Sequence, residues 1–113
     1  MESGVIVVFI TAPRAKGEDI AMKILEKRLA ACVNIVPVKS MYWWRGRIER
    51  DDEDLLIVKT TVTAMGKLIE EVKKIHPYTV PEILGLPVVA CNREYCEWAR
   101  GEVGQAPHGE GKG

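Results

Sequence analysis

The sequence predicts an α+β fold: a ferredoxin-like βαββαβ sandwich with a long projecting β-hairpin and a short C-terminal helix. Two observations predict it. Apolar spacing alternates between strand-like and helix-like stretches in that order, and the two middle strands follow each other through a tight turn. This order gives one antiparallel sheet with both long helices on the same face. A chain of 113 residues, 47% of them hydrophobic, forms a single domain, which we place at residues 1–103.

The first strand and the first helix are indicated by simple patterns. Gly4 to Thr11 contains the apolar run VIVVFI, in which β-branched residues dominate, as they do in buried strands. The proline and glycine of the following TAPRAKG end this strand. A helix is expected from Glu18 to Ala31, because acidic residues begin it, basic residues lie near its end and apolar residues recur at helical spacing.

Residues 33–60 are expected to form one long hairpin that turns at Arg45–Gly46. Each arm has about 12 residues, or roughly 40 Å, whereas a small sheet needs strands of only about six residues. The outer part must therefore project, unless it folds back on the helices of the domain. The run MYWW at residues 41–44 makes both faces of the arm apolar near its tip. Because an isolated apolar ribbon is a sticky edge, the pattern favours self-association.

A second helix, a fourth strand and a closing helix complete the domain. Thr63 is expected to cap a helix that ends near His76, because Pro77 disfavours helical geometry in the residue before it. The stretch PEILGLPVVACN, residues 81–92, is expected to be a kinked strand, and NREYCEWARG a short helix. Residues 104–113 contain four glycines and no large apolar side chain, which predicts a disordered tail.

Charge and composition narrow the function classes. Sixteen basic and sixteen acidic residues cancel, so neither nucleic acid nor a membrane surface is expected as a partner. The apolar run from Val5 to Ile10 is far too short to span a bilayer, which takes about 20 residues. An odd count of three cysteines without a Cys-x-x-Cys motif favours free thiols and a cytoplasmic location.

The chemistry-bearing residues do not form a catalytic motif, so we expect a protein that is not an enzyme. Gly-x-Ser-x-Gly, P-loop, Gly-x-Gly-x-x-Gly and His-Glu-x-x-His motifs are all absent from the sequence. A nucleophilic pair of His76 with Cys32 or Cys91 stays open. The thiols, Cys96 among them, and His76 are ligand types that suit copper, but their spacing is not diagnostic. The acidic run at residues 50–54 is more typical of a solvated strand than of a hard-cation site.

The corner HPYTVPEI, residues 76–83, joins the second helix to the fourth strand. Its two prolines fix the chain direction, so His76 and Glu82 are held near one end of the sheet. Lys59 interrupts an apolar strand and must face solvent, a cleft or a partner charge, for which Glu82 is a candidate. The corner is either purely structural or the rim of a cleft between subunits.

Five sequence blocks resemble the CutA family of divalent-cation tolerance proteins, in the order and spacing of that family. They are KRLAACVNIVP, SMYWWRGRIE, IVKTT, HPYTVPEI and REYCEW, and the resemblance covers residues 4–103. It implies a ferredoxin-like homotrimer, similar in architecture to the PII signalling proteins, in which long hairpins pack subunit against subunit. It also implies a role in tolerance to copper and other divalent cations, without a defined reaction.

The resemblance also implies roles for individual residues that match the motifs of the family. His76 matches a suggested copper ligand, but Ile10 and Ile75 stand where some bacterial members have cysteine and histidine. We therefore expect weak or indirect binding of Cu²⁺ or another divalent cation, with no required cofactor. The alternative is a PII-like trimer that binds a small molecule in a cleft between subunits. The expected cleft residues are Tyr42, Lys59 and Glu82, and the expected trimer-interface residues are Trp43, Trp44, Tyr78 and Trp98.

Overall fold

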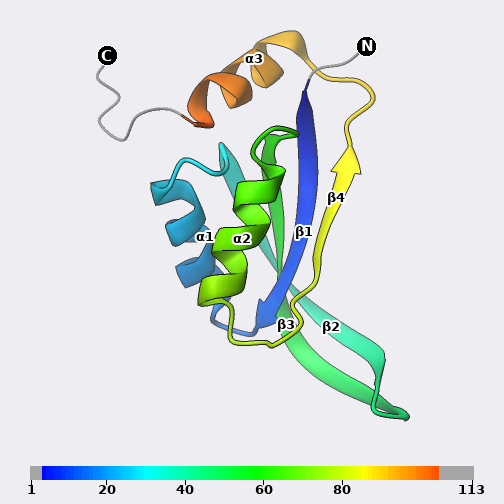
Figure 1. Ribbon diagram of the computed structural model, residues 1–113. Helices are drawn as coiled ribbons and strands as arrows, with labels where there is room; N and C mark the ends of the chain where they lie inside the picture. The colour runs from blue at the N-terminus through cyan, green and yellow to red at the C-terminus, as the bar shows by residue number, and fades with distance from the viewer. Residues whose placement is uncertain (1–3, 105–113) are drawn as a thin grey trace.

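The computed structural model describes residues 4–104 and confirms the α+β fold. Four strands form one antiparallel sheet in the order β2-β3-β1-β4 (Figure 1). Of the predicted tail, only Gly104 lies within the described residues. The elements are β1 (Val5–Pro13), α1 (Gly17–Glu26), β2 (Cys32–Trp44), β3 (Arg47–Thr61), α2 (Met65–Ile75), β4 (Ile83–Pro87) and α3 (Arg93–Glu102).

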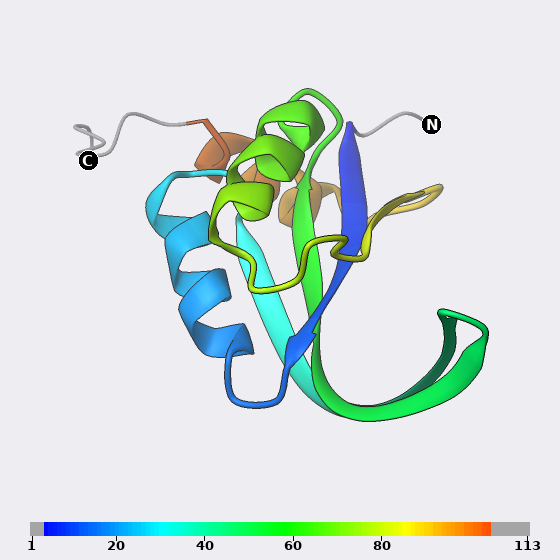
Figure 2. The ribbon, with the colours of Figure 1, turned by 60° about the horizontal axis from the view of Figure 1, so that its bottom comes forward.

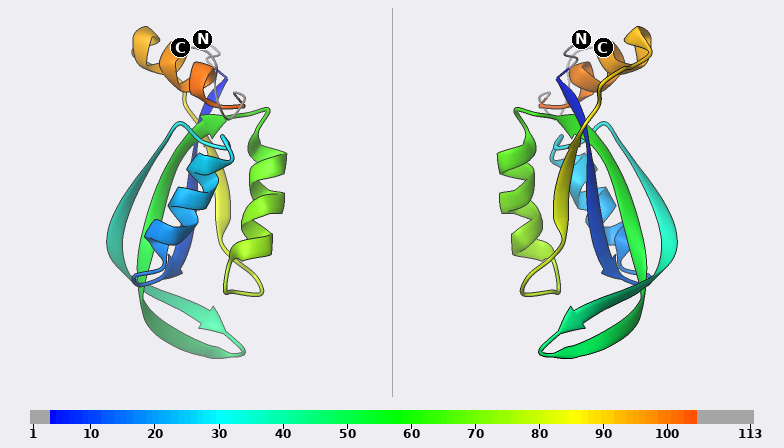
Figure 3. Two further views of the ribbon diagram at one scale, coloured as in Figure 1. Left: turned by 90° about the vertical axis from the view of Figure 1, so that its left-hand side faces the viewer. Right: turned by 90° about the vertical axis from the view of Figure 1, so that its right-hand side faces the viewer.

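The core lies between the sheet and the two long helices. Both α1 and α2 cover the same face of the sheet (Figures 2 and 3). Side chains alternate along the central strands, so every second residue enters this layer. Complete burial of such side chains stabilises the fold by roughly 1.5–3 kcal/mol each. The apolar residues of this layer with 0% exposure are Val8, Ile10, Ala12, Leu56, Val58, Leu68 and Val72.

Helix α1 ends at Glu26, five residues before the predicted end at Ala31. Arg28 has a φ of 58°, a left-handed conformation that a helix cannot continue through. The backbone N–H of Arg28 donates to the Leu25 carbonyl, and the N–H of Leu29 donates to the Ile24 carbonyl. These two bonds close the helix and turn the chain toward β2.

The hairpin turn is where the sequence predicts it. Trp44 faces Arg47 across the turn, and both Arg45 and Gly46 have positive φ. Strand β1 pairs with β3 only as far as Glu53, so the outer parts of β2 and β3 pair with each other alone. This ribbon, residues 39–52, is called the arm below. It projects past the end of the sheet and does not fold back on α1 or α2 (Figure 1).

Strand β4 is shorter than predicted, and the prediction of free thiols is wrong for Cys91 and Cys96 but holds for Cys32. The strand stops at Pro87, which has no N–H to donate to the sheet. Helix α3 then starts after Asn92, whose side chain accepts the Glu94 N–H over 3.2 Å. Within its first turn Cys96 forms a disulfide with Cys91, with 6.4 Å between their α-carbons. A spacing of five therefore brings these two thiols together, because the helix cap turns the chain back on itself.

Helix α3 covers one end of the sheet (Figures 1 and 3). Val5, Cys96 and Ala99 form a small second apolar cluster there. Across residues 4–104, no helix is both long and apolar enough to cross a lipid bilayer.

Candidate functional site

The corner between α2 and β4 is attached to β3 at the base of the arm. The Tyr78 hydroxyl donates to Oε2 of Glu53 over 2.6 Å, and Glu53 is only 5% exposed. The rings of Tyr78 and His76 are in tilted contact, with centroids 4.9 Å apart. Burial, followed by the hydrogen bond to Glu53, raises the pKa of the Tyr78 hydroxyl. Tyr78 therefore stays protonated and acts as a donor to a buried carboxylate.

His76 is buried, and both of its ring nitrogens have partners. Nδ1 accepts the backbone N–H of Tyr78 over 3.0 Å, and Nε2 lies 2.7 Å from the carbonyl oxygen of Thr11. Because Nδ1 accepts and a carbonyl can only accept, Nε2 carries the hydrogen and donates it. The ring is therefore held as one neutral tautomer. A metal ion at His76 would have to displace one of these two partners, so this site stays a prediction.

Glu82 lies at the end of the corner, within electrostatic reach of the carboxyl group of Glu53. Burial is the main cause that raises the pKa of Glu82, the negative charge of Glu53 adds to it, and a hydrogen bond with Thr11 opposes it. Two carboxyl groups that lie near each other can attract a cation or share a proton. The residues that the structure describes contain no group of three or more His, Cys, Asp or Glu side chains arranged to hold a metal ion.

Lys59 does not lie beside Glu82. It faces Val7 and Cys32 in the sheet, donates from Nζ to Oδ1 of Asn34, and lies 4.0 Å from Sγ of Cys32. Strand β4 starts opposite Ile10, so Glu82 is about four residues farther along the sheet, or roughly 13 Å. Lys59 and Glu82 therefore do not form the predicted pair within one chain.

Tyr42 lies on the arm, far from both residues. Its hydroxyl donates to Oδ2 of Asp51, and this hydrogen bond is the main cause that raises the pKa of Tyr42 to about 12. Along β2, Tyr42 is ten residues from Cys32, the strand partner of Lys59, which corresponds to roughly 33 Å. The three predicted cleft residues, Tyr42, Lys59 and Glu82, therefore do not converge within one chain. They can meet only if another subunit contributes some of them.

Three of the four predicted interface residues are exposed on the single chain, and the fourth, Tyr78, is partly buried. The Arg45 guanidinium lies over the Trp44 ring, 5.5 Å from its centroid. The exposure of Trp43, Trp44 and Trp98 agrees with a place in a trimer interface, which stays a prediction. The exposed fractions are 72% for Trp43, 46% for Trp44 and 45% for Trp98.

Most of the face of the sheet opposite α1 and α2 is apolar, although Lys59 shares it with Val7, and the sequence reasoning missed this surface. Its residues alternate with the core residues of β1, β3 and β4, and Leu84 among them is 55% exposed. The signal was present, because a strand that is apolar at nearly every position, as in VIVVFI, is typical of burial on both faces. These residues are Val7, Phe9, Leu55, Ile57, Leu84 and Leu86.

Comparison with known proteins places this architecture in one family. Residues 6–102 match the family model of the CutA1 divalent ion tolerance protein. The chain belongs to the CutA1 family. The Divalent-cation tolerance protein CutA of Thermus thermophilus is 53% identical over 100 residues, which cover 87% of this chain and 97% of that protein. Human Protein CutA is 44% identical over 94 residues, and this chain spans about half of its length (52%).

Solved CutA1 structures share the fold. The Thermus thermophilus CutA1 structure matches with a TM-score of 0.86 at 52% identity, covering 88% of this chain and 99% of that one. The CutA1 crystal structure from Oryza sativa also has a TM-score of 0.86, at 42% identity, with 90% and 95% covered. The agreement confirms the family resemblance identified from the five sequence blocks.

Proposed function

We propose that this protein is a homotrimer that acts in divalent-cation tolerance and that binds Cu²⁺ or a similar ion weakly or indirectly. The contacts of His76 are the observation that carries this proposal. A histidine whose two nitrogens are both engaged can bind a metal only at the cost of a hydrogen bond, which weakens the site. The relatives named for divalent-cation tolerance support the biological role.

The apolar sheet face and the arm support self-association. Large apolar surfaces on soluble proteins mark interaction sites, and here the face opposite α1 and α2 and the aromatic arm both carry exposed apolar side chains. Strand β3 contributes to both surfaces, so a neighbouring copy could cover both at once. A heterologous contact that closes into a ring gives a cyclic trimer.

The second candidate is a PII-like trimer that binds a small molecule in a cleft between subunits. The position of Lys59 favours it. Lys59 is partly buried and contacts the side chains of Asn34 and Cys32, and neither contact is an ion pair with a carboxylate. Tyr42 of a neighbouring arm and Glu82 would complete the cleft if the arm of one subunit crosses the sheet of the next.

A cytoplasmic, non-enzymatic protein remains our proposal. The disulfide removes Cys91 from any Cys–His nucleophile pair. It also weakens the free-thiol argument for the cytoplasm, because only Cys32 of the three cysteines remains free. Among the relatives, one CutA from Oryza sativa is named chloroplastic and the Archaeoglobus fulgidus structure is titled periplasmic.

Two measurements test the proposal. Sedimentation equilibrium should give a mass three times the 12.6 kDa of the chain at micromolar concentration. Calorimetric titration with Cu²⁺ above pH 7 should show weak binding that His76→Asn abolishes without loss of the trimer. His108→Ala, which removes the other of the two histidines, is the matched control and should bind as the parent does. A monomer, or tight copper binding that survives His76→Asn, would contradict the proposal.

A further inference from the structure

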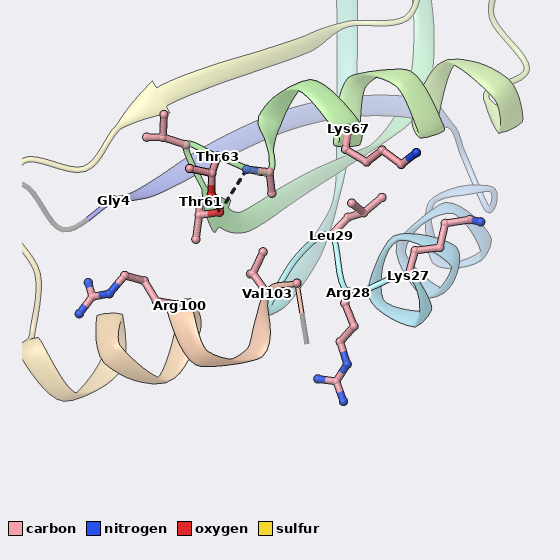
Figure 4. A pocket seen from close by; sticks show the side chains of 12 residues that line it. Gly4, Lys27, Arg28, Leu29, Thr61, Thr63, Lys67, Arg100 and Val103 are labelled. Atoms are coloured by element: carbon pink, nitrogen blue, oxygen red, sulfur yellow. Dashed lines mark hydrogen bonds between the residues drawn. The ribbon is translucent and has the colours of Figure 1, made fainter. Parts of the chain in front are cut away.

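A pocket of about 550 Å³ lies at the end of the sheet opposite the arm. Four segments that are distant in the sequence surround it: the start of β1, the turn after α1, the turn before α2 and the end of α3 (Figure 4). Its volume lies within the range of pockets that hold small organic ligands, about 300–1,000 Å³. The lining residues include Gly4, Leu29, Thr61, Val62, Thr63, Ala64, Val103 and Gly104.

The charged residues that line this pocket are all basic. They are Lys27, Arg28, Lys67 and Arg100, and no Asp or Glu among residues 4–104 lines it. Figure 4 shows Lys27 and Lys67 extending in the same direction on one side, whereas the guanidinium groups of Arg28 and Arg100 point outward. Arg28 is already paired with Glu102 over 2.8 Å. Lys27 and Lys67 also have a carboxylate partner, Glu71, but they share it, so these two lysines are the groups best placed to receive an anion.

The carboxylate beside these lysines does not balance their charge. Glu71 lies 3.6 Å from Lys27, 3.5 Å from Lys67 and 3.1 Å from Lys74, so three ammonium groups share it. Glu70 lies 3.7 Å from Lys67 but is well exposed, and an exposed pair of this kind contributes little. A positive field therefore remains at the side of the pocket where Lys27 and Lys67 extend. The N-terminus of α2 adds to this field, because it carries a positive partial charge and no acidic residue in the first turn offsets it.

The inner part of the pocket is apolar with two hydroxyl groups. Leu29 is 7% exposed, and Val103 lies across from it at the end of α3 (Figure 4). Thr61 Oγ1 accepts the Ala64 N–H over 3.3 Å and lies 3.2 Å from the Thr63 hydroxyl. A ligand that fits these surroundings has a compact apolar body, a polar edge and a negatively charged group.

We propose that this pocket binds a small organic anion, with its phosphate or carboxylate group between Lys27 and Lys67 and its apolar part against Leu29 and Val103. All of these residues belong to one chain. The site is therefore independent of the subunit cleft and of any metal at His76, and it goes beyond the proposed role in cation tolerance.

Three probes separate the contributions of charge and apolar surface. Phenyl phosphate carries both, inorganic phosphate carries the charge alone, and benzyl alcohol carries the ring alone. Calorimetric titration of the full chain should rank phenyl phosphate first, and its affinity should fall as salt is raised, because exposed charges are screened beyond about 10 Å at 0.1 M salt. Benzoate in place of phenyl phosphate tells whether a carboxylate serves as well. Equal affinity for phenyl phosphate and benzyl alcohol would overturn the proposal.

Matched lysine variants locate the site. Lys67→Gln should weaken phenyl phosphate binding roughly tenfold, the usual effect of losing one charge-assisted hydrogen bond. Lys73→Gln, on the same helix but outside the pocket lining, should change it little. Methyl NMR gives a second readout, in which phenyl phosphate should shift the methyl signals of Leu29 and Val103. Equal losses in the two variants, or shifts elsewhere only, would show nonspecific charge attraction and reject the site.

Discussion

Gly17 lies directly against the carboxylate of Asp54. The Gly17 N–H donates to Oδ2 of Asp54 over 3.0 Å, and the Ala15 N–H donates to the same oxygen over 3.0 Å. A β-carbon added at Gly17 would lie 2.8 Å from that oxygen and 3.0 Å from Cδ1 of Leu56. The start of α1 is therefore fixed to β3 through a contact that has no room for a side chain.

Gly17→Ala should destabilise the protein for this reason. The added methyl group must push away either Asp54 or Leu56, and overpacking of this kind costs about 1–3 kcal/mol. Gly66→Ala in α2 is the control, because nothing lies within 4 Å of its added β-carbon, and helix propensity predicts a gain of up to about 1 kcal/mol. Urea denaturation should give opposite signs for the two variants. The same sign for both would contradict the packing argument.

Tyr78→Phe should cost about 1–3 kcal/mol of unfolding free energy, because it leaves buried Glu53 without its 2.6 Å hydrogen bond. Tyr42→Phe provides the comparison, since its partner Asp51 is exposed and can bond to water instead. Chemical denaturation at neutral pH should show a larger loss for Tyr78→Phe. If Glu53→Gln is made first, the later loss of the Tyr78 hydroxyl should cost less.

Glu71 should stabilise the fold at neutral pH and lose that effect in acid. Hydrogen bonding from Lys74, followed by the nearby lysine charges, lowers the pKa of Glu71 below its ordinary value of 4.5. A lowered pKa stabilises the folded state above 4.5, and the effect is lost as pH falls through the folded value. The gap in urea midpoint between the parent and Glu71→Gln should therefore close on acidification.

Glu82 should behave in the opposite way. Its pKa is raised, so the folded state favours the protonated carboxyl, and the relative stabilisation is lost as pH rises through that raised value. Glu82→Gln should then be most stabilising, relative to the parent, at neutral pH. Urea midpoints across the acid range check this, and matching slopes for Glu71→Gln and Glu82→Gln would contradict both assignments.

Trp44→Ala should weaken self-association. Truncating a large aromatic side chain in an interface commonly costs about 3 kcal/mol or more. Met22→Ala is the control, because Met22 is also exposed (51%) but lies on α1, away from the apolar sheet face and the arm. Sedimentation equilibrium across a dilution series should show dissociation only for Trp44→Ala. A trimer of unchanged stability in that variant would remove the arm from the interface.

The fold was predictable because its signals are local. Apolar spacing, the Arg45–Gly46 turn and Pro77 each depend on neighbouring residues, and the structure has these elements in the predicted order. The end of α1 was misplaced because its stop signal is not a glycine or a proline. Arg28 adopts a left-handed conformation there, which its residue type does not indicate.

The candidate site was only partly predictable because it depends on register. The sequence indicated that His76, Lys59 and Glu82 are unusual, but it could not tell which residues of β1 they would face. A shift of a few residues along β1 separates Lys59 from Glu82. The Cys91–Cys96 disulfide was missed because it depends on the turn that Asn92 makes before α3.

The two ends of the described chain both line the pocket at the end of the sheet. The carbonyl of Gly4 accepts the Val62 N–H over 2.9 Å, and the Gly104 N–H donates to the Arg28 carbonyl over 2.8 Å. A linker that spans the pocket from Gly104 back to Gly4 would therefore allow circular permutation, with new ends opened in the Arg45–Gly46 turn. Such a permutant would cut the arm while leaving the helical layer continuous, which would separate the contribution of the arm to assembly from its contribution to folding.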